Sequence, residues 1–400
     1  MDMFKLIRPA PVTQHVRSRD AYIYFHRACV VVGWTPPERG IARYLYLIWG
    51  FLAVAGGICY CPVGFVIPYF LEFKNFTPGE FLNSLKVCIN AYGSSFKASV
   101  TLLMLWRLHA TEKLLDEMDK RIQNDKERTI LHAMVARCNY AFLIYTFIYC
   151  SFAGSTFLSY TLSGRPPWYI YMPFVNWRNG LGSLWTQALF EYAVMSTVCL
   201  QDQLADVYPL IYTLMLRCHF ALLIDRVRNL RKDPNKTEDE NFQDLVNCVI
   251  DHKMIKRCSA MFRPVISLTI FAQFLLIGIV LGLTLINLFF FSDFWRGVAS
   301  VMFIVTILTQ TFPFCYTCNF LMDDCDDLSK AIFQSNWIDA EPRYKRTLSY
   351  FMHNVQQPIV FLAGGTFPIN MNTNISVAKF AFSIITIVRQ MNLADRFITD

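Results

Sequence analysis

The clearest chemical pattern lies in the last apolar stretch of the chain, from Asn374 to Asn392. A lysine sits inside this stretch, and hydroxyl and amide side chains recur around it. An α-helix turns by about 100° per residue, so these polar groups share a band of roughly 80° on one face. The band holds Ser376, Lys379, Ser383, Thr386 and Gln390, and the opposite face holds Ala381, Ile384, Ile385 and Val388.

This band predicts a helix that faces water inside a membrane. A lysine within a bilayer costs several kcal/mol unless it meets water or a partner, and a helix exposed to lipid would not gather its polar groups on one side. A water-filled pathway explains the lysine and the band together. Two alternatives stay open: a polar seam against a neighbouring helix, and extension of Lys379 to the membrane interface.

Two other sets of reactive residues give weaker evidence. Cys315 and Cys318 have CxxC spacing, but they lie in an apolar run without a second ligand pair. Buried thiols are the better interpretation. His132, His252 and His353 lack metal-ligand spacing, and we find no zinc motif, phosphate loop or nucleophile elbow. The sequence therefore predicts no enzyme, cofactor or metal.

The elements that must position the polar band are membrane helices. The 400 residues are 54% hydrophobic and only 17% charged, whereas about a quarter of a soluble domain is charged. The first forty residues hold basic side chains and no apolar core, so we expect the first span to act as the insertion signal. The net charge of +7 lies in loops, which favours a membrane topology over nucleic-acid binding.

Seven apolar runs are long enough for transmembrane helices, which need about 20 mostly apolar residues. Besides the last stretch they are 41–70, 81–106, 139–162, 182–204, 264–291 and 297–319. The expected fold class is an all-α membrane protein with seven transmembrane helices.

The basic residues predict how these helices are oriented. Lys and Arg are concentrated in 107–138 and 205–263, and the loops on the other side hold few. Because cytoplasmic loops carry the excess of basic residues, we expect a cytoplasmic N-terminus and an extracellular C-terminus, the reverse of G-protein-coupled receptors. The sequon at Asn75 should then be open to glycosylation, and the one at Asn235 should stay bare.

The basic segments carry helical patterns. A capping box begins at Thr237, and two apolar stripes follow helical spacing. The stripes are Phe242, Val246, Val249, Ile250 and Met254, and Leu114, Leu115, Met118 and Ile122. Such faces need a partner, so we expect the spans to extend into a packed cytosolic layer. Helices lying on the lipid surface are the alternative.

The expected organisation has four parts. It comprises a cytoplasmic segment (1–40), six membrane helices with cytosolic extensions (41–320), a cytosolic anchor helix and turn (321–372), and a pore-lining helix with a short extracellular tail (373–400). Gly364, Gly365 and Pro368 break the helical pattern and predict the turn that redirects the chain into the last span.

Five segments resemble insect odorant receptors, and most of all the fruit-fly members. They are FTPGEFLNSLKVCINAYGSS (76–95), VARCNYAFLIYTFIYCSFAGSTFLSYTLSGRPPW (135–168), LTQTFPFCYTCN (308–319), AIFQSNWIDAEPRYKRTL (331–348) and SVAKFAFSIITIVRQMN (376–392). The resemblance covers essentially the whole chain, and QSNW with the final helix is its most specific part. The topology expected from the basic residues agrees with this family.

The resemblance implies an odorant receptor in the plasma membrane of olfactory sensory neurons. Odour-tuned subunits would assemble with a shared co-receptor subunit, and the four subunits of this heterotetramer would surround one pore. The complex would be an odorant-gated cation channel that passes monovalent and divalent cations without selectivity. A metabotropic seven-helix receptor that couples to G proteins is the alternative.

The resemblance also implies roles for residues of the last helix. The family's gating pattern, an aliphatic residue, Gln and another aliphatic residue, corresponds to Ile387, Gln390 and Met391, where Met391 departs from the pattern. Ile387 and Met391 flank the polar band, so a rotation of the helix on opening would be needed to bring them into the pore. A cation pore should not narrow at a ring of lysines, so we expect Lys379 in its wider inner part or facing an acidic partner.

The odorant site should be an apolar cavity with one or two polar groups. Depth within the outer half of the spans selects six candidates, for each of which ordinary helix packing is the alternative role. They are Tyr92, Ser155, Phe157, Tyr192, Met195 and Phe303. The loop 163–177, rich in proline and aromatic residues, is expected to fold down as a lid or to form a passive interfacial cap.

Overall fold

The computed structural model describes residues 5–390 except 38–39, 72, 74–75 and 123. Within this part of the chain the regular structure is helical apart from one short hairpin. Helices occupy the described part of all seven ranges expected to span a membrane, so the predicted all-α fold with seven such helices is confirmed.

The helices of the N-terminal half are the 3₁₀-helix η1 (Ser18–Tyr22), α1 (Ile23–Val31), α2 (Ile41–Val54), the π-helical η2 (Ala55–Tyr60), α3 (Cys61–Leu71), α4 (Pro78–Leu103), α5 (Leu105–Asp119) and α6 (Asp125–Leu162). After the short η4 (Trp177–Asn179) follow α7 (Leu181–Arg228), α8 (Glu238–Phe290), α9 (Phe294–Phe333), α10 (Pro342–Val355), the strands β1 (Leu362–Ala363) and β2 (Phe367–Pro368), and α11 (Met371–Gln390).

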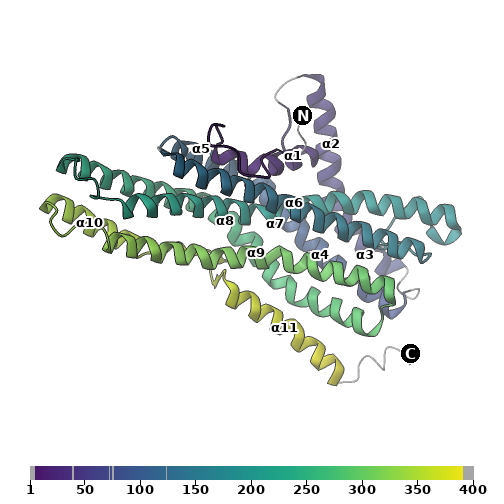
Figure 1. The fold of residues 1–400 in the computed structure, drawn as a ribbon. Helices are drawn as coiled ribbons and strands as arrows, with labels where there is room; N and C mark the ends of the chain where they lie inside the picture. The colour runs from purple at the N-terminus through teal and green to yellow at the C-terminus, as the bar shows by residue number, and fades with distance from the viewer. Residues whose placement is uncertain (1–4, 38–39, 72, 74–75, 123, 391–400) are drawn as a thin grey trace.

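Four long helices, α6 to α9, run side by side along the molecule (Figure 1). Helix α7 lies at the centre, and all of its residues from 201 to 213 are buried. Figure 1 also shows α10 at one end of the bundle and α11 at its edge. Hereafter the end where α6 leads into α7 is the loop end, and the opposite end is the α10 end.

Length and apolar composition alone identify five membrane-crossing candidates among the described residues: Arg43–Leu71, α6, α7, α8 and α9. Helices α4 and α11 are not among the five, although both match predicted spans. Helix α4 is more polar, because it carries Lys86 and Lys97, and α11 carries Lys379. Polar groups on these two helices need partners or water, which directs attention to them as functional elements.

The start of α8 follows the predicted capping box. Thr237 Oγ1 accepts from the Glu240 backbone N–H at 3.3 Å, and the Glu240 carboxylate accepts from the Thr237 N–H at 2.8 Å. Thr77 and Glu80 begin α4 in the same way. These reciprocal bonds satisfy backbone donors that a helix start otherwise leaves free.

The two predicted apolar stripes have different outcomes. In α5, Leu115 and Met118 are buried, as expected of a packed layer. In α8 the buried apolar side chains are instead Leu245, Cys248 and Ile255, while Ile250 of the predicted stripe is 39% exposed. Phe242, Val249 and Met254 of the predicted stripe are partly buried and pack against the core, so the stripe lies at the margin of the most buried face of α8.

The break before the last helix is the β1–β2 hairpin. Gly364 and Gly365 have φ values of +59° and +74°, a region that glycine adopts without steric cost. The Gly364 N–H donates to the Ser267 carbonyl at 2.9 Å, so α8 holds the turn in place. This is the redirecting turn predicted from Gly364, Gly365 and Pro368.

Candidate functional site

Side chains of α4, α6, α7 and α9 enclose a cavity of about 20 Å³ inside the bundle. Its apolar wall is formed by Val87, Ala91, Phe152, Met195, Val198, Cys199 and Phe303, and its polar residues are Asn90, Ser94, Tyr149, Asp202, Thr306 and Gln310. The space suits about one water molecule, whereas ligand pockets typically exceed roughly 300 Å³. A volatile molecule would therefore enter only if side chains moved.

Two of the six predicted odorant-binding residues line this cavity. Met195 and Phe303 are both buried and face it from α7 and α9. The Phe303 ring lies 5.1 Å from the Phe152 ring, centroid to centroid. Methionine adapts its shape easily, and aromatic rings supply large apolar surfaces. The cavity wall therefore has the composition expected for a small apolar ligand.

The other four predicted residues lie elsewhere. Phe157 and Tyr192 pack against each other with centroids 4.8 Å apart, outside the cavity. The Ser155 hydroxyl donates to the Phe152 carbonyl at 3.1 Å. Tyr92 is 48% exposed on the surface of α4. Depth along a helix could not show which face of the helix looks toward this cavity.

The polar side of the cavity belongs to a buried charge network that sequence reasoning missed. Lys97 Nζ lies 2.8 Å from Asp202 Oδ1 and 2.7 Å from Asp206 Oδ1. The Tyr149 hydroxyl donates to Asp206 at 2.6 Å, and Gln310 Nε2 donates to Asp202 at 3.0 Å. Helices α4, α6, α7 and α9 therefore meet at one set of hydrogen bonds beneath the apolar wall.

A signal for this network was present in the sequence. Lys97, Asp202 and Asp206 are ionisable residues within or beside predicted spans, and such residues in a membrane usually have a functional or pairing role. Asp202 and Asp206 are also one helical turn apart, on the same face of a helix. The partner was not identifiable, because Lys97 precedes Asp206 by 109 positions.

The loop 163–177 folds onto the loop end of the bundle, as a lid or a passive cap would. Trp168 and Ile170 are buried, and their backbone N–H groups donate to the Glu191 carboxylate at 2.8 and 3.0 Å. The Tyr171 N–H donates to the Gly64 carbonyl at 2.9 Å. On its other side the loop lines an open pocket of about 610 Å³ that also includes Glu80 and Gln187. Sequence analysis did not single out Glu191.

The polar band of α11 faces away from the other helices of the chain. Ala381, on the opposite face, is fully buried beside Leu281 and Leu285 of α8. Lys379, Ser383 and Thr386 are exposed, as is Ser376. The hydroxyls of Ser383 and Thr386 donate to carbonyls of their own helix at 3.0 and 3.1 Å. A polar seam against another helix of the same chain is therefore absent along these described residues.

The predicted gate lies at the limit of what the structure describes. The backbone of α11 continues as a helix through Ile387 and Gln390. The side chains of both residues, together with Met391, lie outside the described part of the chain, and so does Asn75. The gate and the glycosylation site stay predictions.

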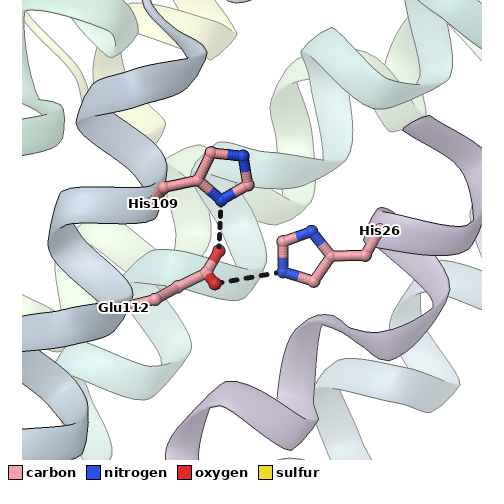
Figure 2. Close-up of side chains that lie close together, drawn as sticks. All are labelled: His26, His109 and Glu112. Atoms are coloured by element: carbon pink, nitrogen blue, oxygen red, sulfur yellow. Dashed lines mark hydrogen bonds and ion pairs between the residues drawn. The ribbon is translucent and has the colours of Figure 1, made fainter. Parts of the chain in front are cut away.

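A second polar cluster joins α1 to α5 (Figure 2). His26 Nε2 lies 3.1 Å and His109 Nδ1 3.9 Å from the Glu112 carboxylate, which also accepts from the Tyr212 hydroxyl at 2.7 Å. Although burial alone would raise the pKa of Glu112, the two neighbouring imidazoles and the Tyr212 hydroxyl lower it to about 2. The nearby Glu112 carboxylate also raises the pKa of His109.

This cluster is the one set of described residues with the spacing of a metal site, since its ligand atoms lie within 4.8 Å of one another. Its hydrogen bonds also give it a structural role, because Glu112 of α5 links His26 of α1 to Tyr212 of α7. Cys315 and Cys318, the CxxC pair, are both buried free thiols on α9.

Comparisons with known proteins agree on one family. The family model described as 7tm Odorant receptor matches residues 77–382. Odorant receptor 59b of Drosophila melanogaster is 66% identical across 99% of this chain and 100% of its own. Odorant receptor 42b of the same species is 58% identical across the full length of both chains.

The fold also matches a solved structure. The insect olfactory receptor OR5 from Machilis hrabei superposes with a TM-score of 0.75 at 14% identity, covering 93% of this chain and 98% of that one. The same receptor in complex with eugenol gives a TM-score of 0.72 at 15% identity, with 94% and 99% coverage.

Proposed function

The chain belongs to the insect odorant receptor family, and on that premise we propose that it is the odour-tuned subunit of an odorant-gated, nonselective cation channel. The observation that carries the proposal is the orientation of α11. Its exposed polar band, with Ala381 packed against the bundle, suits a helix with protein on one side and water on the other. The family is one of receptors and not of enzymes, and it does not favour coupling to G proteins.

The proposed pore is shared between subunits. One copy of α11 presents Lys379, Ser383 and Thr386 to the outside of its own bundle, so an enclosed pathway needs further copies of the helix from other subunits. The proposed partner is the family's shared co-receptor, in a heterotetramer in the plasma membrane of olfactory neurons. The proposed contribution of this chain to the gate consists of Ile387, Gln390 and Met391.

The proposed odorant site is the cavity behind Met195 and Phe303, with Tyr149, Asp202 and Gln310 on its polar side. The ligand is a small volatile molecule that enlarges the cavity by displacing side chains. Because the cavity lies among α4, α6, α7 and α9, its expansion moves helices that pack on the rest of the bundle. Eugenol, in the solved complex of the Machilis hrabei receptor, is a ligand of this size class.

The proposed topology places the N-terminus in the cytoplasm and the α10 end in a cytosolic anchor layer. The basic segments 107–138 and 205–263 and the helix α10 support this orientation. Enzymatic removal of glycans tests it: a shift in mobility lost in Asn75→Gln and kept in Asn235→Gln is expected. The opposite pattern would contradict the proposed orientation.

Whole-cell recording tests the function as a whole. The chain is expressed with and without the co-receptor, and an odour panel is applied while current and cyclic nucleotides are recorded. We expect fast odour-evoked cation current that depends on the co-receptor. Absence of current in both conditions, with a second-messenger rise from this chain alone, would contradict the channel proposal.

A further inference from the structure

Lys86 of α4 is a buried amine with little to bind. Its side chain is 2% exposed. Within the described part of the chain the Nζ atom has one hydrogen bond, a long one of 3.4 Å with the Ser300 hydroxyl, and it lies 5.3 Å from the centre of the Phe303 ring. Among the described residues it forms no ion pair with a carboxylate. Buried polar groups without good partners are costly, so this position requires an explanation.

Lys97, on the same helix, is a buried lysine whose charge is paired. It is 1% exposed, and two carboxylates hold it at 2.8 and 2.7 Å. Lys86 and Lys97 are separated by three turns of α4 and differ by only about 20° around it. The cavity residues Asn90 and Ser94 lie between them along the helix. The cavity therefore has a paired lysine at one end and a poorly paired lysine at the other.

Phe303 separates Lys86 from the cavity. Its ring lines the cavity and also lies beside the Lys86 amine. A cavity of about 20 Å³ must enlarge before any odorant fits, and Phe303 is a wall whose movement would enlarge it. The same movement would bring the Lys86 amine into the enlarged space.

A lysine offers three hydrogen-bond donors and no acceptor. Ser300 engages one donor, so two are free for a ligand. A carbonyl oxygen accepts such bonds and brings no donor of its own, whereas a hydrocarbon of the same shape leaves the amine unsatisfied. The adjacent wall of Phe152, Met195 and Phe303 suits a short apolar chain.

We propose that Lys86 selects odorants by donating to a carbonyl oxygen, and that the ligands of this receptor are small ketones and esters. This inference rests on the proposed odorant site and adds the chemical class of its ligand. The carbonyl lies toward the Lys86 end of the enlarged cavity, and the alkyl groups lie against Met195 and Phe152.

Matched odorants test the inference in the full chain expressed with the co-receptor. The probes are ketones and esters of five to nine carbons, each paired with a hydrocarbon of the same shape, such as 4-heptanone with 4-methylheptane. Half-maximal concentrations are measured by odour-evoked current. A hydrogen bond to a charged group supports about a tenfold or larger preference for the carbonyl member, and this preference should disappear in Lys86→Met.

Two further variants make the result specific. Lys86→Arg keeps the donors and should retain the preference for carbonyl odorants. Ser300→Ala, which removes the one hydrogen bond that Lys86 forms with a described residue, should retain it as well. Lys113→Met, at an exposed position of α5, is the matched control and should change no response. The Arg and Ala variants keep the test informative if Lys86→Met does not reach the cell surface.

Three results would overturn the inference. They are equal potency of ketone and hydrocarbon in the unmodified receptor, an unchanged potency ratio in Lys86→Met, and loss of the ratio in Ser300→Ala with Lys86 intact. Each leaves odour-evoked current in place, so the channel proposal would survive. Absence of any co-receptor-dependent current would instead overturn the proposed function.

Discussion

At the scale of single residues, the most informative side chains are ionisable groups placed where apolar ones would pack. Glu191, Lys97 and Glu112 each satisfy several partners from distant parts of the chain. Removing one such group leaves its partners buried and unsatisfied, which costs more than the hydrogen bond itself contributes. Their effects should therefore be large for single substitutions.

Glu191→Ala should release the loop 163–177. The carboxylate accepts from two loop N–H groups and from Gln187 Nε2 at 3.0 Å, so its loss should lower the free energy of unfolding by about 1–3 kcal/mol. The measurements are thermal unfolding and the rate of tryptic cleavage at the exposed Arg178. Glu117→Ala, on an exposed surface of α5, is the control. Unchanged cleavage would show that other contacts hold the loop.

Lys97→Met should destabilise the bundle by about 3–5 kcal/mol, because it leaves Asp202 and Asp206 buried without their cation. Adding Asp202→Asn and Asp206→Asn should recover part of that loss, since the unpaired charges are then gone. The thermal midpoint of the purified full chain in detergent measures both effects. Lys330→Met, on the exposed surface of α9, should be neutral. A thermal midpoint of the triple variant below that of Lys97→Met would contradict the charge argument.

At the scale of elements, α1 depends on the cluster of His26, His109 and Glu112. Glu112→Ala removes the carboxylate shared by both imidazoles and by Tyr212. Amides of α1 should then exchange with deuterium at least about tenfold faster, as expected for loss of 1.4 kcal/mol or more of local stability. Exchange in residues 201–207 of α7, which are all buried and do not contact Glu112, should not change. Equal protection of α1 in both proteins would show that apolar packing alone holds it.

The last helix, α11, carries the prediction for ion passage. Lys379 is exposed on the polar band. Two unit charges 4 Å apart in water, such as the lysine amine and a passing cation, interact by about 1 kcal/mol. Lys379→Glu should therefore raise the permeability of calcium relative to sodium by a few fold, measured from reversal potentials. Lys113→Glu is the control for a general charge effect. Unchanged reversal potentials would place Lys379 outside the ion pathway.

These elements also show how far sequence reasoning could reach. The polar band of α11 was predictable because periodicity within one helix defines a face without knowledge of its partners. The packed face of α8 was predictable only in part: Phe242, Val249 and Met254 do pack against the core, but the most buried side chains are Leu245 and Cys248. The lining of the cavity was predictable only in part for a similar reason. Depth in the membrane selected Met195 and Phe303, whereas Asp202 and Gln310 could be identified only from the positions of the helices in the fold.

At the scale of the whole molecule, two features matter for function: the cavity among α4, α6, α7 and α9, and the exposed polar band of α11. The positions and order of the seven spans followed from the apolar runs of the sequence, and the all-α fold with seven such helices was confirmed. The assembly that would enclose α11 lies beyond a single chain. The central claim is therefore that the exposed band of α11, and not its buried face, lines the ion pathway of the assembled receptor.

Cysteine accessibility tests that claim most directly. Ser383→Cys and Ala381→Cys are expressed with the co-receptor, and a charged thiol reagent is applied during odour-evoked current. The unmodified chain, whose Cys59 and Cys150 are exposed, gives the background. The account predicts that the reagent blocks Ser383→Cys current in the presence of odorant and leaves Ala381→Cys unaffected. Block of Ala381→Cys with no effect on Ser383→Cys would contradict it.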